Sequence, residues 1–239
     1  MIEVLLCGEG PTDYGTPKLP GEPWLEGAVQ PIIRKMAVVN FENVRKDSLK
    51  DRRLQRSIKD SKVKGHGIKS FVLSNIAREK SIKYVICYVD ADREHSTSKS
   101  ENDAQKRFLE IYNQIMEGFN AFNSKSKSYE VIGIPMVPIR MIESWLLGDE
   151  SAYEKCFGKK PSNPKLPKKP EFLWGKEDDP NSDFPKCYLD RVLKQYNEVS
   201  SRKVFNEIAE NIDIENLRNT CYISFFKFCE DFKNIKHDV

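Results

Sequence analysis

Two mainly apolar runs, residues 2–7 and 83–89, constrain the fold most because an acidic residue follows each closely. The first run, IEVLLC, continues into Gly8 and Glu9, and the second, KYVICYV, continues directly into Asp90. Such short apolar runs are typical of strands that are covered on both faces. Segments with helical spacing lie between the runs, so we expect parallel strands joined by crossover helices.

The remaining elements follow from the same patterns. Residues 38–44 and 129–137 are predicted strands, and residues 15–23 a loop. Helices are predicted over 24–37, 65–80, 101–122 and 140–150. Pro31 interrupts the first helix and is expected to kink or split it. Ser100, three residues before Asp103, is typical of a capped helix start.

The alternation of strands and helices ends near residue 150. Residues 158–186 are rich in lysine, proline and asparagine, and three helical segments follow. We therefore predict an α/β domain over residues 1–150, with a mostly parallel sheet flanked by helices. A basic connector and a helical extension over 151–239 are expected to pack on the same unit.

Composition constrains the partners and the cellular compartment expected for this chain. The 39 basic and 36 acidic side chains leave a net charge of +3, so any nucleic-acid contact must come from local clusters. No apolar run approaches the ~20 residues of a membrane span, and no signal peptide is apparent. The six cysteines form no CxxC pair, which favours free thiols in a cytoplasmic protein with no membrane partner. The even number also leaves disulfides open.

Acidic residues at the strand ends indicate a metal site. Asp90 and Asp92 are two residues apart, so both carboxylates can face the same way from an extended chain. Glu9 lies at the corresponding end of the first strand, and Asp13 is close to it along the chain. Ligands of open parallel sheets bind at this edge, and clustered carboxylates suit Mg²⁺ or Mn²⁺. Such an ion supports phosphoryl transfer.

The motifs GEGPTD (8–13) and VDAD (89–92) resemble those of the Toprim domain, a Rossmann-like fold found in topoisomerases, primases and nucleases of the overcoming-lysogenisation-defect type. The stretches 65–71, 134–149 and 168–186 extend the resemblance to a bacterial family of Toprim-like proteins, DUF4276. The resemblance implies a Mg²⁺-dependent nuclease acting on DNA or RNA. Such proteins are often tied to anti-phage defence and sometimes paired with an ABC-type ATPase.

The resemblance also implies roles for single residues. Asp90 and Asp92 would hold the metal, Glu9 would be a metal ligand or a general acid-base, and Asp13 would help hold a second ion. Asp13 has an alternative role as the cap of a turn. Independently of the resemblance, Glu143 lies among core-like neighbours, where it either forms a structural pair with Arg140 or completes the metal cluster.

Basic residues indicate where nucleic acid would bind. Residues 45–64 carry nine basic and three acidic side chains, and a second basic cluster lies in the connector. The candidate contacts are Arg52, Arg53, Arg56, Lys64, His66, Lys165, Lys168 and Lys169. A solvated helix surface is the alternative interpretation of the first cluster. Phe172 and Trp174 either stack on bases or pin the connector to the core.

Two functions fit this sequence. The first is a metal-dependent nuclease with Glu9, Asp90, Asp92 and Glu143 in its catalytic site. The second is a non-catalytic module that binds nucleic acid or a partner ATPase. The chain contains no GxxxxGK[ST] loop, so it is not expected to hydrolyse ATP by the P-loop route.

Overall fold

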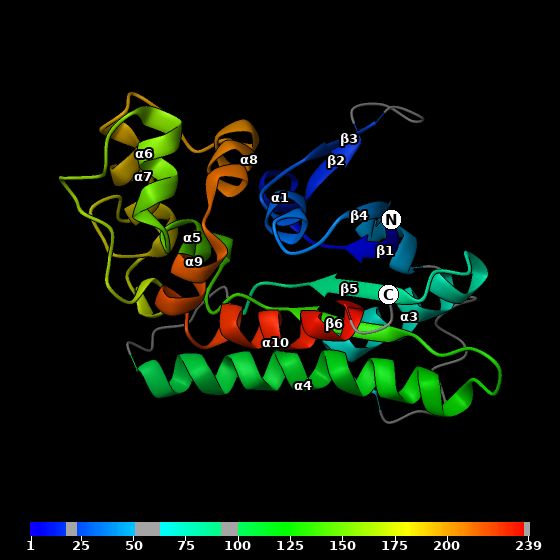
Figure 1. Cartoon of the computed structure of the whole chain (residues 1–239). Helices are drawn as coiled ribbons and strands as arrows, with labels where there is room; N and C mark the ends of the chain where they lie inside the picture. The colour runs from blue at the N-terminus through cyan, green and yellow to red at the C-terminus, as the bar shows by residue number, and fades with distance from the viewer. Residues whose placement is uncertain (18–22, 51–62, 92–99, 237–239) are drawn as a thin grey trace.

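The computed structural model describes residues 1–17, 23–50, 63–91 and 100–236. Four parallel strands form the main sheet in the order β4 (Val39–Val44), β1 (Ile2–Cys7), β5 (Tyr84–Tyr88) and β6 (Ile132–Met136). Cys7 of β1 is in register with Val44 of β4 and Cys87 of β5. The predicted parallel α/β sheet is therefore confirmed, with its four strands close to the expected positions (Figure 1).

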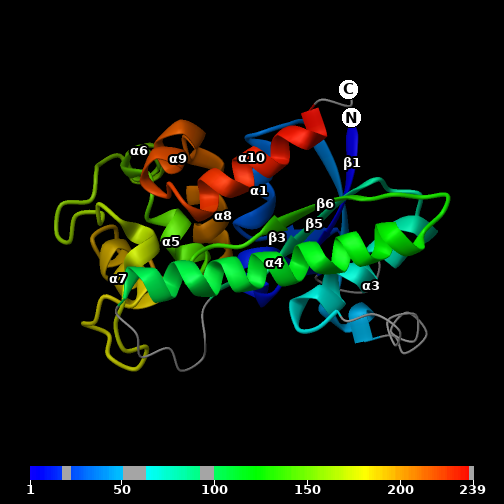
Figure 2. The same cartoon turned by 90° about the horizontal axis from the view of Figure 1, so that it is seen from below.

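Alternate residues of the strands enter two separate cores, as the period of a strand requires. Leu5 and Cys7 face α3 (His66–Glu79) and α4 (Glu101–Lys125), which pack against each other. Val4 and Leu6 belong to the other core, which includes α1 and much of the C-terminal extension. Both α4 and α10 contact β6, and Figure 2 shows these two long helices flanking that strand.

The predicted helix over 24–37 is wrong in its first part. Trp24–Glu26 is a short strand, β3, that pairs antiparallel with β2 (Gly15–Pro17). The helix α1 covers only Val29–Arg34. Pro31 is its third residue, where the backbone nitrogen has no acceptor within the helix, so the helix includes the proline and is not split by it.

The remaining elements are a short 3₁₀ helix, the capped helix α4 and the helices of the C-terminal extension. A short 3₁₀ helix, η2, covers Lys46–Lys50 after β4. Ser100 caps α4 as predicted, since its side chain accepts a hydrogen bond from the Asp103 backbone N–H. The later helices are α5 (Ile142–Leu146), α6 (Glu150–Phe157), η3 (Pro170–Phe172), α7 (Pro185–Lys194), α8 (Arg202–Asn211), α9 (Ile214–Thr220) and α10 (Ser224–Lys236).

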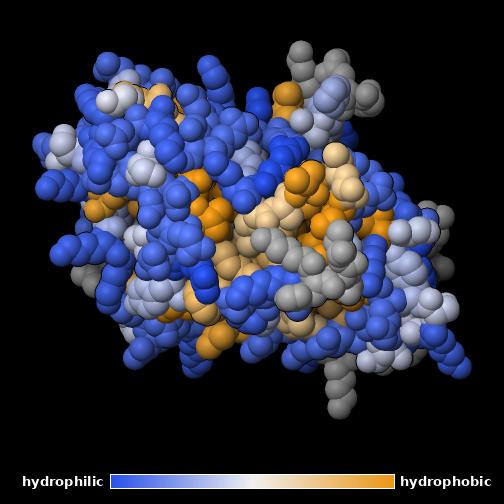
Figure 3. All heavy atoms as spheres, in the orientation of Figure 1, coloured by the Kyte–Doolittle hydropathy of each residue, from blue (hydrophilic) through white to orange (hydrophobic). Residues whose placement is uncertain are grey.

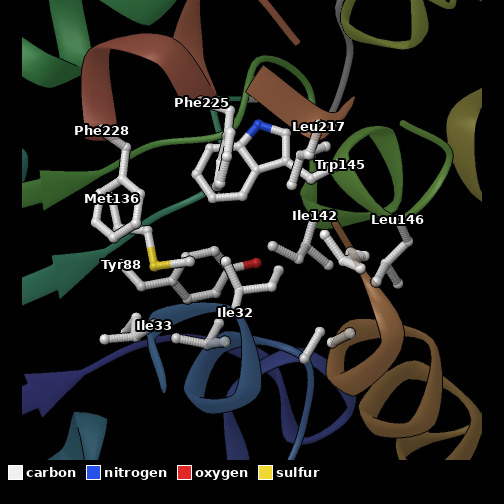
Figure 4. Packing of buried hydrophobic residues seen from close by; sticks show 14 of the residues in the cluster. Ile32, Ile33, Tyr88, Met136, Ile142, Trp145, Leu146, Leu217, Phe225 and Phe228 are labelled. Carbon is white, nitrogen blue, oxygen red and sulfur yellow. The ribbon is translucent and has the colours of Figure 1, made fainter. Parts of the chain in front are cut away.

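The extension and the sheet share one hydrophobic core. The Trp145 ring of α5 packs edge-on against Phe225 of α10, with 4.9 Å between the ring centroids. Figure 4 shows these rings above Tyr88 of β5, with Ile32 of α1 below it. Figure 3, in the orientation of Figure 1, shows hydrophobic residues gathered over the middle of the visible face, while mainly hydrophilic residues cover the end that contains α6 and α7.

A buried carboxylate ties the connector to α10. Glu171 of η3 is 1% exposed and accepts hydrogen bonds from the backbone N–H groups of Ile223 and Ser224. The Ser224 hydroxyl also donates to Glu171 and accepts from the Trp145 indole N–H at 2.9 Å. These bonds satisfy donors at the start of α10, which have no acceptor within the helix.

Candidate functional site

The carboxyl end of the sheet has its switch point between β1 and β5. From β1 the chain passes to β4 on one side, and it later enters β5 on the other. Ligands of open α/β sheets bind in the crevice formed where the strand order reverses in this way. Glu9 follows β1 and Asp90 follows β5, so both residues lie at this crevice.

Glycines allow the chain after β1 to fold back across the end of β5. A Cβ on Gly8 would lie 2.7 Å from Tyr88 Cδ1 and 2.8 Å from Tyr14 Cγ, so a larger residue does not fit. Gly10 has a φ of +77°, and a Cβ there would lie 2.7 Å from Asp13 Oδ2. The turn η1 (Gly10–Tyr14) thereby brings Asp13 close to β5.

One buried hydroxyl joins two carboxylates. Tyr88 Oη donates to Asp90 Oδ1 at 2.7 Å and lies 3.3 Å from Asp13 Oδ2. Tyr88 is 1% exposed, and Figure 4 shows its hydroxyl pointing away from Met136, toward Ile142. A hydroxyl has one proton to donate, so it cannot fully satisfy both ionised carboxylates.

Glu143 of α5 adds a third carboxylate. Its side chain is buried, and burial, together with the nearby charge of Asp13, raises its pKa to about 8. Burial also raises the pKa of Asp13 to about 6 and that of Asp90 well above its usual range. We call Asp13, Asp90 and Glu143 the acidic cluster.

Little positive charge in the described structure balances the acidic cluster. No residue of the cluster forms an ion pair with another described residue, and an Arg140–Glu143 pair is not formed. The charge of Lys186, on α7, acts to lower the pKa of Asp13 and of Glu143, but burial has the larger effect and both pKa values stay raised. The helical extension thus contributes a cation beside the cluster.

Glu9 has different surroundings at the same edge. Its carboxylate pairs with Lys69 of α3 and, at 3.3 Å, with Lys46 of η2. Partial burial acts to raise the pKa of Glu9, but the hydrogen bond and charge of Lys69, with help from Lys46, lower it below the usual value. Glu9 is therefore ionised and held by two lysines, whereas the acidic cluster retains protons.

Most of this chain matches one protein family. Residues 9–233 match the family described as Domain of unknown function (DUF4276). The chain belongs to the DUF4276 family. No match is found among curated proteins or among solved structures. The match starts at Glu9, so the DUF4276 region includes the whole acidic cluster.

The predicted nucleic-acid contacts of this DUF4276 chain lie in several places. Arg52, Arg53, Arg56 and the proposed ligand Asp92 fall outside the described residues. Lys64, just before α3, is exposed, and so are Lys165 and Lys168 in the connector. Lys169 pairs with Glu101 at 3.0 Å, and Phe172 packs toward Tyr222, which favours a pinning role for this part of the connector.

His66 lies close to Glu9 rather than in the acidic cluster. Its backbone N–H donates to Gln114 Oε1 at 3.0 Å, which fixes the start of α3 against α4. Burial, with the nearby charge of Lys69, lowers the pKa of the imidazole to about 4. His66 is therefore neutral at pH 7 and carries no positive charge for phosphate binding.

The sequence analysis does not predict three residues near the site, Tyr88, Lys69 and Lys186. Tyr88 could have been found, because it is two residues before Asp90 and so faces the same way from the strand. Lys69 and Lys186 reach the site only through tertiary packing of α3 and α7.

None of the helices among the described residues has the length and apolar character needed to cross a membrane.

Proposed function

We propose that the acidic cluster binds Mg²⁺ or Mn²⁺ and that the chain is a metal-dependent nuclease with a Toprim-like fold. The observation that carries this proposal is the meeting of Asp13 and Asp90 at one tyrosine hydroxyl, with the charge of Glu143 acting on both. None of the three has an ion-pair partner among the described residues. The parallel sheet, with Glu9 and Asp90 at the carboxyl ends of neighbouring strands, supports the fold assignment.

The chemistry of the donors fits a hard divalent cation. Carboxylates that raise one another's pKa are relieved when a cation binds between them. Asp13 and Asp90 are partly exposed and so within reach of an ion from solvent, with Glu143 buried near them. Among the described side chains no group of three or more His, Cys, Asp or Glu residues has an arrangement that could by itself hold a metal ion. Mg²⁺ commonly uses only one or two carboxylates, together with water and substrate phosphates.

Each residue around the ion would have its own role in phosphodiester cleavage. A bound ion would supply stabilisation of the charge that develops on phosphate oxygens. Tyr88 would hold Asp90 in position through its 2.7 Å hydrogen bond. Glu143, buried beside the other two carboxylates, would lose its proton when the ion binds and complete the negative charge that holds it. Lys186 would attract the phosphate to the cluster.

The ion pairs of Glu9 favour a second candidate function. Because Glu9 is committed to Lys69 and Lys46, the same edge of the sheet could bind nucleic acid or a partner ATPase without turnover. In that case the site would take up nucleic acid equally well with and without a divalent ion.

Cleavage assays separate the two functions. Purified protein is incubated with labelled single-stranded DNA, double-stranded DNA and RNA in Mg²⁺, Mn²⁺ or EDTA. The proposal predicts cleavage of at least one substrate with metal, abolished by Asp90→Asn and retained by Asp103→Asn, which alters an exposed aspartate on α4. Cleavage that survives Asp90→Asn, or intact substrates under every condition, contradicts nuclease activity.

A further inference from the structure

A groove lies between the β2–β3 hairpin and the carboxyl end of β4. It consists of two hollows of about 440 Å³ and 400 Å³, and Trp24 and Arg45 line both of them. Each volume falls within the range of about 300–1,000 Å³ that is usual for small-molecule sites. We call the two hollows together the Trp24 groove.

The indole in this groove is held in place by its neighbours. Trp24 Nε1 donates to the Tyr14 carbonyl oxygen at 2.9 Å, and the Tyr14 ring packs 4.9 Å away at an angle of 49°. A Cβ on Gly15 would lie 3.0 Å from Nε1, so the close approach requires glycine. Trp24 is nevertheless only half-buried. A fixed aromatic surface loses little freedom when a ligand stacks on it.

Arg45 supplies a positive charge that is free to bind a ligand. Its side chain is exposed, and it makes no hydrogen bond or ion pair with any other described residue. The two lysines that line the groove differ in this respect. Lys46 pairs with Glu9 at 3.3 Å, and Lys80 pairs with Glu42 at 2.8 Å. Arg45 is therefore the groove cation best able to contact a phosphate.

We infer that the Trp24 groove binds an unpaired nucleotide, with its base stacked on Trp24 and its phosphate paired with Arg45. The inference rests on the proposed function, because it names single-stranded nucleic acid as the form of substrate. Neighbouring bases cover both faces of a base inside a duplex, so only an unpaired base can stack on the indole. A free nucleotide offers the same base and phosphate.

The groove leads to the edge of the sheet that carries the acidic cluster. Gly8, Glu9 and Gly10 line the hollow of about 400 Å³ together with Trp24. The turn η1 separates the two sites, because Asp13 approaches Tyr88 and Asp90 whereas Tyr14 packs on Trp24. A strand bound in the groove would therefore approach the acidic cluster past Glu9.

Binding measured in EDTA tests the inference without requiring cleavage. Fluorescence anisotropy is recorded with a labelled single-stranded oligonucleotide, its duplex, and a mononucleotide as competitor. Trp24→Ala and Arg45→Ala should each weaken single-strand binding roughly tenfold, since stacking of one base contributes about 1–3 kcal/mol. Trp24→Phe should retain most of the affinity. Duplex binding should be weaker and unchanged by Trp24→Ala.

Two matched variants serve as controls. Phe226→Ala removes another exposed aromatic ring, which stacks with Arg218, and Lys127→Ala removes an exposed positive charge. Arg45 is exposed, so Arg45→Ala tests the groove even if Trp24→Ala fails to fold. Equal affinities for all these variants, or duplex binding that is as tight and as sensitive to Trp24→Ala, overturn the inference.

The remaining outcomes identify the ligand and separate the two proposals. Competition by the mononucleotide that is lost in Trp24→Ala supports the groove and assigns free nucleotides as ligands too. Loss of binding in Trp24→Ala without cleavage of any substrate upholds the groove and contradicts the nuclease. Cleavage that depends on Asp90, combined with unchanged binding by Trp24→Ala, upholds the nuclease and overturns the groove.

Discussion

The Tyr88 hydroxyl donates a 2.7 Å hydrogen bond to the carboxylate of Asp90, two residues further along the chain. Strand geometry sends both side chains to the same side of the sheet, so this pair is set locally. The 3.3 Å approach of Asp13 to the same hydroxyl depends instead on the η1 turn. The Tyr88 hydroxyl therefore contacts one carboxylate that is placed by the strand itself and one that is placed by tertiary folding.

Tyr88→Phe is expected to weaken binding of Mn²⁺ about 10–100-fold, as is usual when a group that orients a metal ligand is removed. The ring remains, so the fold should be retained. Calorimetric titration with Mn²⁺ measures the change. Tyr112→Phe is the matched control, because its hydroxyl donates to Asp231 at 2.9 Å on α10. Equal losses in the two variants would argue against a special role for Tyr88.

Stability in EDTA should fall as the pH rises from about 5 to 8. The folded protein keeps a proton on Asp13 up to about pH 6 and one on Glu143 up to about pH 8, whereas the unfolded chain has released both, because burial raises both pKa values. Raising the pH therefore lowers the free energy of unfolding, by roughly 1 kcal/mol per pH unit for each such proton. Asp190 and Lys186 also act on Glu143, in opposite directions.

Thermal unfolding at several pH values measures this dependence. Glu143→Gln should flatten it, and Mn²⁺ should reduce it in the unmodified protein. Glu130→Gln, which changes an exposed carboxylate, should leave it unchanged. Stability that increases between pH 5 and 8 in EDTA would contradict the assignment of protons to the acidic cluster.

Gly8→Ala is expected to lower the free energy of unfolding by about 1–3 kcal/mol and to weaken Mn²⁺ binding. The added methyl group would press on the rings of Tyr88 and Tyr14 and displace the η1 turn. Gly158→Ala provides the comparison. Nothing lies within 4 Å of its added Cβ, and only its φ of +76° is unfavourable, so it should lose stability without losing metal affinity.

The sequence predicts the elements whose signals are local. The strand β5 is an uninterrupted apolar run, and α4 has both helical spacing and a serine cap, so local sequence predicts both elements. The apolar spacing of Trp24–Glu26 continues that of α1 and so predicts a helix, although pairing with β2 makes the segment a strand. Pairing between short strands depends on tertiary contacts that no local pattern contains.

In the candidate site, too, the sequence predicts the residues at strand ends but not the contacts that depend on tertiary packing. The positions of Glu9 and Asp90 follow from strand ends, which apolar runs identify. The ion pair between Glu9 and Lys69 and the effect of the Lys186 charge on Glu143 could not be predicted. Both depend on how helices distant in the sequence pack around the sheet.

Titration of the protein with Mn²⁺ tests the central claim most directly. We predict saturable binding by the unmodified chain, a rise in melting temperature with metal, and loss of both in Asp13→Asn combined with Asp90→Asn. The exposed pair Asp103→Asn and Glu130→Gln should bind as before. Absence of Mn²⁺ uptake, or equal uptake by the Asp13 and Asp90 double variant, would contradict a metal site at the acidic cluster.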